Sequence, residues 1–279
     1  MNGVQRLESV IGPAARENRV ALVAMIHVGA LPGTPRAERS VGELACAAVG
    51  EALLLAECGV DAIMMENMHD APFMNRRVGP EVVAAMTAIV WAVRAAVKVP
   101  LGVQVLAGAN REALAIAQAC GCQFIRAEGF VFSHVADEGL MAEADAGPLL
   151  RYRRLIGAES IAVLADVKKK HSAHAMTQDV SLAETAEAAE FFGADGVIVT
   201  GSATARPTDP AELASVKGAV KIPVIAGSGV TPENLATIAA HADAVIVGSC
   251  LKKDGHWAQP AERARVEAMV RAVAQASRL

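Results

Sequence analysis

Eight short, almost wholly apolar runs recur along the chain, and each is followed by a longer alanine-rich amphipathic stretch. The runs cover residues 20–28, 60–67, 100–107, 123–130, 160–169, 194–201, 222–226 and 242–248. Apolar residues at nearly every position are typical of strands that are covered on both faces. Alternation of such strands with helices predicts repeated βα units and a parallel sheet. Eight units predict an α/β fold, a (β/α)8 TIM barrel with a parallel eight-stranded core.

Helix signals between the runs support this alternation. Four places have the spacing of a capping box or of a cap before proline: Ser40 with Glu43, Ser181 with Glu184, Asp209 with Pro210, and Thr231 with Pro232. We expect helices to begin there. Similar sequence motifs at residues 58–62, 192–196 and 240–244 indicate repeated helix ends, the first two of which are closed by glycine. An open doubly wound sheet is the alternative, but residues 29–33 do not match its dinucleotide-binding G-x-G-x-x-G fingerprint.

Length and composition limit the classes of protein. A chain of 279 residues suits one barrel of about 250 residues, so we expect a single domain over residues 1–279. A net charge of −4, with Lys and Arg scattered apart from Lys168–Lys170, argues against binding nucleic acid. The five cysteines lack zinc-site spacing and are expected to be reduced.

The chain shows no signal-peptide pattern in residues 1–13. It also contains no apolar run of the ~20 residues that a transmembrane segment needs. We therefore expect a cytoplasmic protein, with peripheral association with a membrane left open.

Polar residues interrupt the apolar runs near their ends, where barrel enzymes carry their chemistry. The catalytic candidates are His27, Glu66, Arg126, Glu128, Asp166 and Lys168. Gln104 also ends a run, and Asn67, His69 and Asp70 follow the second one. We expect Glu66, Arg126, Asp166 and Lys168 to share one cavity at the carboxyl end of the barrel.

The fifth run carries the most informative pair. If its strand continues, Leu164, Asp166, Lys168 and Lys170 all point to one side. An aspartate and a lysine at a barrel mouth can shift each other's pKa and serve proton transfer or enolate stabilisation. The alternative is a structural ion pair beside a solvated lysine loop.

A metal site is a second interpretation of these residues. His27, Glu66 and Asp166 offer nitrogen and oxygen ligands for a divalent metal, but no metal-ligand spacing such as H-x-H or H-E-x-x-H supports one. His27 alone in an apolar strand is also compatible with a purely structural hydrogen bond. No cofactor is assigned.

Glycine and serine follow the last three runs, which predicts a phosphate site after strands 7 and 8. The candidate phosphate-binding residues are Gly201, Ser202, Gly227, Ser228, Gly229, Gly248 and Ser249. Glycine lets the backbone approach an anion, and free N–H groups at a helix start can donate to it. Barrels often hold phosphate after these two strands.

Two features suggest contacts beyond the barrel. The segment 130–146 is long for a βα loop and contains two phenylalanines, so we expect a lid or an oligomer contact. The apolar helices expected over residues 45–55 and 82–93 predict a homodimer or a larger homo-oligomer.

Several motifs together resemble the BtpA/SgcQ family. They are residues 25–35 (MIHVGALPGTP), Glu66-Asn67, Arg126-Ala127-Glu128, residues 165–171 (ADVKKKH) and residues 227–230 (GSGV). The resemblance covers almost the whole chain. It implies a TIM-barrel enzyme whose reaction is unsettled. One branch is associated with photosystem I biogenesis at thylakoid membranes, and another with sugar-metabolism gene neighbourhoods.

Two functions follow as hypotheses. The first is an enzyme that binds a small phosphorylated ligand, such as a sugar or nucleoside phosphate, and acts by acid/base, lyase or hydrolase chemistry. The second is a non-catalytic assembly or stability factor of the photosystem I biogenesis type. Buried polar residues cost stability unless they are paired, so their gathering at the strand ends favours the enzyme.

Overall fold

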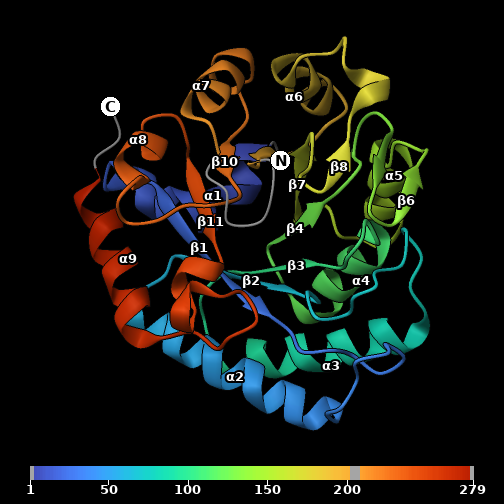
Figure 1. The fold of residues 1–279 in the computed structure, drawn as a ribbon, viewed down its shortest axis with the longest axis vertical. Coiled ribbons are helices and arrows are strands. Elements are labelled where there is room, and N and C mark those ends of the chain that lie inside the picture. Colours follow the sequence, from blue (N-terminus) through green and yellow to red (C-terminus); the bar gives the residue numbers. More distant parts are fainter. Residues whose placement is uncertain (1–2, 202–207, 277–279) are drawn as a thin grey trace.

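Eight parallel strands close into a barrel in the computed structural model, which describes residues 3–201 and 208–276 (Figure 1). The strands are β1 (Ala21–His27), β2 (Ala62–Glu66), β3 (Leu101–Gln104), β4 (Phe124–Ala127), β7 (Ala162–Val167), β9 (Gly196–Val199), β10 (Val224–Ala226) and β11 (Ala244–Val247). Strand β1 pairs in parallel with both β2 and β11, which closes the ring. Each strand lies within one predicted run, so the predicted (β/α)8 barrel is confirmed.

One helix follows each barrel strand and forms the outer layer. These helices are α2 (Val41–Cys58), α3 (Pro80–Ala96), α4 (Asn110–Cys120), α5 (Ala146–Leu155), α6 (Leu182–Phe191), α7 (Pro210–Ala219), α8 (Leu235–Ala239) and α9 (Arg263–Gln275). Three short 3-10 turns occur at η1 (Ala175–Thr177), η2 (Ser249–Leu251) and η3 (Lys253–Gly255).

Three of the four predicted helix starts are confirmed. Ser40 and Ser181 cap α2 and α6 in complete capping boxes, and Asp209 caps α7. The start predicted at Pro232 is wrong, because α8 begins at Leu235. The Asn234 side chain accepts a hydrogen bond from the Thr231 N–H and donates one to the Gly229 carbonyl, which holds a turn in place of the first helical residues.

Two apolar layers alternate along each strand. Side chains of one parity fill the barrel interior, and those of the other parity pack under the helices. The interior is narrowed by the Phe124 ring, which leaves no room for a side chain opposite it: a Cβ at Gly102 would lie 2.1 Å from a carbon of that ring. Helix α1 (Gly3–Arg16), which precedes the barrel, closes the amino end by placing Leu7, Val10 and Ala14 against this interior layer.

The motif repeated at residues 58–62, 192–196 and 240–244 contains an aspartate that has a structural role at the amino ends of the strands. Asp61, Asp195 and Asp243 accept hydrogen bonds from the backbone N–H groups of Leu22, Val163 and Val224, respectively. Each carboxylate also pairs with a cation, namely Arg19 for Asp61, Arg6 and Arg153 for Asp195, and Lys217 for Asp243. The aspartate of each motif therefore links the start of its strand to the neighbouring strand.

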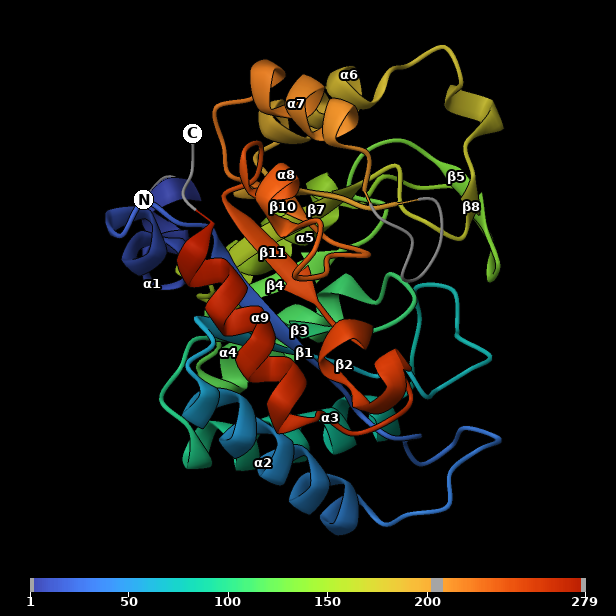
Figure 2. The same ribbon diagram turned by 60° about the vertical axis from the view of Figure 1, so that its left-hand side comes forward.

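The long segment after β4 forms a small sheet at the opposite end from α1 (Figure 2). Strand β5 (His134–Ala136) pairs antiparallel with β6 (Gly139–Met141) and with β8 (Ser172–Ala173), which belongs to the loop after β7. His134, Ala136 and Met141 are buried, whereas Val135 and Leu140 are exposed. The segment thus docks onto the neighbouring βα loop and covers that side of the barrel mouth.

The apolar helices α2 and α3 bury most of their apolar residues within this chain. Leu44 and Leu55 of α2 and Met86 and Ile89 of α3 lie in the core between helices and strands. Leu53 and Trp91 remain exposed. Within the described part of the chain, no helix is both long and apolar enough to cross a membrane.

Candidate functional site

The last inward-facing position of several strands is polar, and these residues therefore meet at the barrel mouth. Side chains alternate along a strand, so His27 follows Met25 and Glu66 follows Met64 on the interior side. Arg126 and Asp166 likewise follow Phe124 and Leu164. Glu66 is directly opposite His27 in the strand register and opposite Gln104 on its other side.

A cavity of ≈250 Å³ opens among these residues. His27, Glu66, Arg126 and Lys170 line one part of it. Residues 227–231, after β10, residues 248–250, after β11, and Arg265 of α9 line another part. The predicted phosphate loops and part of the predicted catalytic cluster thus share one space.

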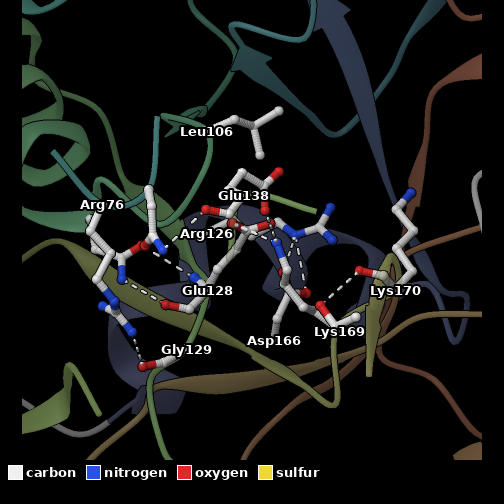
Figure 3. Close-up of polar contacts among 12 residues, drawn as sticks. Arg76, Leu106, Arg126, Glu128, Gly129, Glu138, Asp166, Lys169 and Lys170 are labelled. Carbon is white, nitrogen blue, oxygen red and sulfur yellow. Dashed lines mark hydrogen bonds and ion pairs between the residues drawn. The ribbon is translucent and has the colours of Figure 1, made fainter. Parts of the chain in front are cut away.

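Three buried ion pairs lie beside this cavity (Figure 3). The Nε of Arg126 donates to both carboxylate oxygens of Asp166 at 3.1 and 3.0 Å, and both side chains are buried. The Nζ of Lys169 lies 3.3 Å from Oε2 of Glu128 and 3.7 Å from Oε2 of Glu138. These pairs bridge β4, β7 and the β5–β6 segment, and Asp166 holds Arg126 in place.

The three consecutive lysines point in different directions, which the expected strand continuation did not anticipate. Strand β7 ends at Val167, and Lys168 has a left-handed φ of 47°, so alternation stops there. The Lys168 ammonium donates to the carbonyls of Thr177 and Val180, and with Asp166 it lines a separate cavity of ≈20 Å³. Glu66 and Arg126 therefore share the larger cavity, whereas Asp166 and Lys168 face the smaller one. Lys170 is the lysine that lines the larger cavity.

Burial shifts the pKa values of the charged groups in the larger cavity. It raises the pKa of Glu66, although the charges of Arg126 and Lys170 oppose this shift. Burial and the nearby Arg126 charge lower the pKa of Lys170. For Arg126, burial lowers the pKa, but the carboxylates of Asp166 and Glu66 outweigh it and raise the pKa overall. Burial thus shifts this carboxyl and this amine toward their neutral forms in one cavity, which suits acid/base chemistry.

His27 is a neutral imidazole with a defined orientation. Burial, together with the charge of Lys252, lowers its pKa to about 3. Its Nδ1 lies 2.7 Å from the carbonyl oxygen of Trp257, which can only accept, so Nδ1 carries the proton. Nε2 is then left with a lone pair, and a Cβ at Gly248 would lie only 3.2 Å from it. His27 can accordingly accept a hydrogen bond at Nε2.

The glycines after β10 and β11 allow the backbone to approach the cavity closely. Gly229 has a φ of 63°, a conformation that favours glycine. A Cβ at Gly227 would lie 2.5 Å from Cγ2 of Ile198. Ser249 begins the turn η2 beside the cavity. Gly201 is buried directly after β9, and Ser202 lies outside the described residues.

The polar residues that follow the second strand mainly fix the conformation of the neighbouring loops through hydrogen bonds to backbone groups. The Asp70 carboxylate accepts from the Leu31 N–H and from the Asn67 amide, and Asn67 in turn accepts from the Leu106 N–H. His69 lies against the Trp257 ring, with centroids 4.9 Å apart. In residues 3–201 and 208–276, no three His, Cys, Asp or Glu side chains are grouped so that they could hold a metal ion.

Lys169, Glu138 and Arg265 were not among the site residues predicted from the sequence. Lys169 and Glu138 meet only because the hairpin β5–β6 folds back over β7, and Arg265 reaches the cavity from the last helix. Local periodicity carries no signal for contacts between segments so far apart. For Arg265, the sequence indicated only an arginine near the start of the last helix.

Comparison with known proteins identifies the family. The BtpA family model matches residues 18–275. An uncharacterized mitochondrial protein of Caenorhabditis elegans is 42% identical over 275 residues, covering 97% of this chain and 98% of that protein. The photosystem I biogenesis protein BtpA of Synechocystis is 37% identical over 255 residues, covering 91% and 88%.

A solved structure shares the fold. The (S)-3-O-geranylgeranylglyceryl phosphate synthase of Thermoplasma acidophilum, in complex with sn-glycerol-1-phosphate, superposes with a TM-score of 0.61 at 16% identity, covering 96% of this chain and 99% of that one. At this identity the likeness concerns the barrel alone. The family match and both relatives span nearly the whole sequence, and the chain therefore belongs to the BtpA family.

Proposed function

We propose that this protein is an enzyme that binds a small phosphorylated metabolite, a sugar or nucleoside phosphate, and acts on it by acid/base or lyase/hydrolase chemistry. The observation that carries the proposal is the sharing of one ≈250 Å³ cavity by two glycine-containing loops and by His27, Glu66 and Lys170. The volume lies below the range of about 300–1,000 Å³ that suits drug-sized ligands. We infer a correspondingly small substrate.

The phosphate is expected at residues 227–231 and 248–250, where backbone N–H groups and the Arg265 guanidinium can donate to it. The reacting part of the substrate then extends toward Glu66, Arg126 and His27. Glu66 serves as the acid, and His27 accepts a hydrogen bond from the substrate. Arg126, held by Asp166, orients the substrate. Glu128 positions Lys169, and Lys168 holds the loop after β7.

The phosphate-bound synthase of similar fold supports a phosphorylated ligand for this architecture. We further propose a cytoplasmic location and a homo-oligomer for this chain.

A second candidate is a non-catalytic assembly factor, as the name of the Synechocystis relative suggests for that protein. One structural observation favours it: Val135 and Leu140, cross-strand partners in β5 and β6, are both exposed and give this small sheet an apolar outer face. Such a face suits contact with a partner protein or with a membrane surface.

Thermal unfolding with a ligand panel tests the enzyme proposal. At 100 times its dissociation constant, a phosphorylated ligand raises the free energy of unfolding by about 2.7 kcal/mol. For a domain of this size that corresponds to roughly 5–10 °C in Tm. Sugar phosphates and nucleotides are expected to raise the Tm, while their unphosphorylated counterparts do not.

The variant Gly229→Asp should abolish the shift, because a carboxylate would repel the anion. Gly121→Asp is the matched control, since Gly121 has a φ of 64°, near the 63° of Gly229, and has nothing within 4 Å of an added Cβ. Gly121→Asp should keep the shift. If no phosphorylated compound raises the Tm, or if Gly229→Asp responds as the parent does, the assembly-factor candidate is favoured instead.

A further inference from the structure

Among the described residues, the amine of Lys170 has no hydrogen-bond or ion-pair partner, unlike the amines of its two neighbours. Lys168 is bonded to two carbonyls, and Lys169 lies between two glutamates. Within the described chain, the Lys170 amine makes neither a hydrogen bond nor an ion pair; its backbone N–H donates to the Thr200 hydroxyl, and its carbonyl accepts from the Ser172 hydroxyl. Figure 3 shows its side chain extending on its own, apart from the dashed pairs of Arg126 and Lys169.

The position of this amine is unusual for a lysine. It is mostly buried and lines the same cavity as Glu66, Arg126 and the glycine loops. A buried ammonium normally pairs with a carboxylate, since an unpaired charge is costly to bury. Burial and the neighbouring Arg126 lower the pKa of Lys170, although the charges of Glu66, Asp166 and Glu128 oppose this shift. A lowered pKa enlarges the fraction of neutral amine, and the neutral amine is a nucleophile toward carbonyl carbon.

We propose that Lys170 forms a Schiff base with a phosphorylated aldehyde or ketone whose phosphate lies at residues 227–231 and 248–250. The inference rests on the proposed function and deepens it, because it names the substrate class. It also replaces Lys168, the lysine expected from the sequence, by Lys170.

The cavity contains the groups that supply the protons and the electron pair for this covalent step. The nitrogen lone pair of Lys170 attacks the carbonyl carbon, the C–N bond forms, and the π electron pair of the carbonyl moves to its oxygen. This oxygen takes up the proton that the nitrogen gives up, which yields a carbinolamine. Glu66, whose pKa is raised by burial, donates a second proton to the departing hydroxyl. Water leaves, and a protonated imine remains. Its positive charge can accept the electron pair of an adjacent bond, as lyase or isomerase chemistry requires.

Reductive trapping tests this step on the intact protein. The protein is incubated with dihydroxyacetone phosphate or glyceraldehyde 3-phosphate and sodium cyanoborohydride, and the modified peptide is mapped by mass spectrometry. A trapped Schiff base adds the mass of the probe less one oxygen atom. The neutral fraction of a lysine amine rises as its pKa falls, so Lys170, whose pKa is lowered, should be labelled more than exposed lysines such as Lys253.

Variants and unreactive probes separate the possible results. Lys170→Arg should lose the adduct, whereas Lys168→Arg should keep it on Lys170. Dihydroxyacetone, which lacks the phosphate, should label Lys170 far less than its phosphate ester. Folding of Lys170→Arg is checked by its Tm and by its response to sn-glycerol 3-phosphate, which has no carbonyl group.

The lysine proposal is overturned if neither probe labels Lys170, or if labelling is spread evenly over exposed lysines. If sn-glycerol 3-phosphate still raises the Tm in that case, the phosphate site stands and only the Schiff base is refuted. If no phosphate ester raises the Tm, the proposed function itself fails.

Discussion

The buried pair of Arg126 and Asp166 allows a quantitative test of how the site is held. The variant Arg126→Met keeps much of the side-chain volume but leaves the Asp166 carboxylate, which is 0% exposed, without its cation. Breaking a buried ion pair in this way costs about 3–5 kcal/mol. At about 2–4 °C per kcal/mol for domains of this size, the Tm should fall by roughly 6–20 °C.

A double-mutant cycle shows whether the loss arises from the pair itself. Asp166→Asn leaves Arg126 near the Glu66 carboxylate, so it should cost less than Arg126→Met. The double variant Arg126→Met, Asp166→Asn removes both charges. It should be more stable than the sum of the single losses predicts, by about 1–3 kcal/mol.

Urea unfolding followed by circular dichroism provides the free energies of unfolding for the cycle. Coincidence of the unfolding curves with those from tryptophan fluorescence checks that each variant unfolds in two states. If the single losses add within about 0.5 kcal/mol, the two side chains are not coupled, and Asp166 does not hold Arg126 in place.

Three further expectations concern stability and assembly. Asp195→Ala should cost about 3–5 kcal/mol because it leaves Arg153 and the Val163 N–H without their acceptor; Asp243→Ala, whose partner Lys217 is exposed, should cost less in the same urea assay. Burial lowers the pKa of His27 from 6.5 to about 3. The unfolded chain therefore takes up a proton between these pH values that the fold does not, and stability should decrease as the pH falls through this window, by up to about 1.4 kcal/mol per unit; His27→Gln should flatten this slope in urea titrations at pH 5 and 7. Phe191 and Leu155 are 85% and 80% exposed, so light scattering should give at least twice the 28.8 kDa monomer mass, and a monomer mass would refute the homo-oligomer.

The barrel strands and three helix starts could be predicted from the sequence because they depend on local patterns. Apolar runs define the eight strands of the barrel, and Ser40 and Ser181 form their capping boxes within four residues. The polar residues at the strand ends face the mouth because alternation along a strand is also local. His27, Glu66 and Arg126 were placed correctly at the carboxyl end for this reason.

Features that depend on contacts between distant segments could not be predicted in this way. The left-handed conformation of Lys168 ends the alternation of β7, and nothing in the run of three lysines indicates it. The pairing of Lys169 with Glu138 requires the hairpin of β5 and β6, which the sequence showed only as a long loop. The late start of α8 depends on side-chain hydrogen bonds of Asn234 within a turn.

The central claim is that one anion is held by the loops after β10 and β11, and a crystal structure with sn-glycerol 3-phosphate tests it most directly. We expect the phosphate oxygens within hydrogen-bond distance of backbone N–H groups among residues 228–231 and 248–250, with the glycerol moiety directed toward Glu66 and Lys170. Phosphate bound only near Lys168 or at the protein surface, or a cavity that remains without ligand at saturating concentration, would contradict the account.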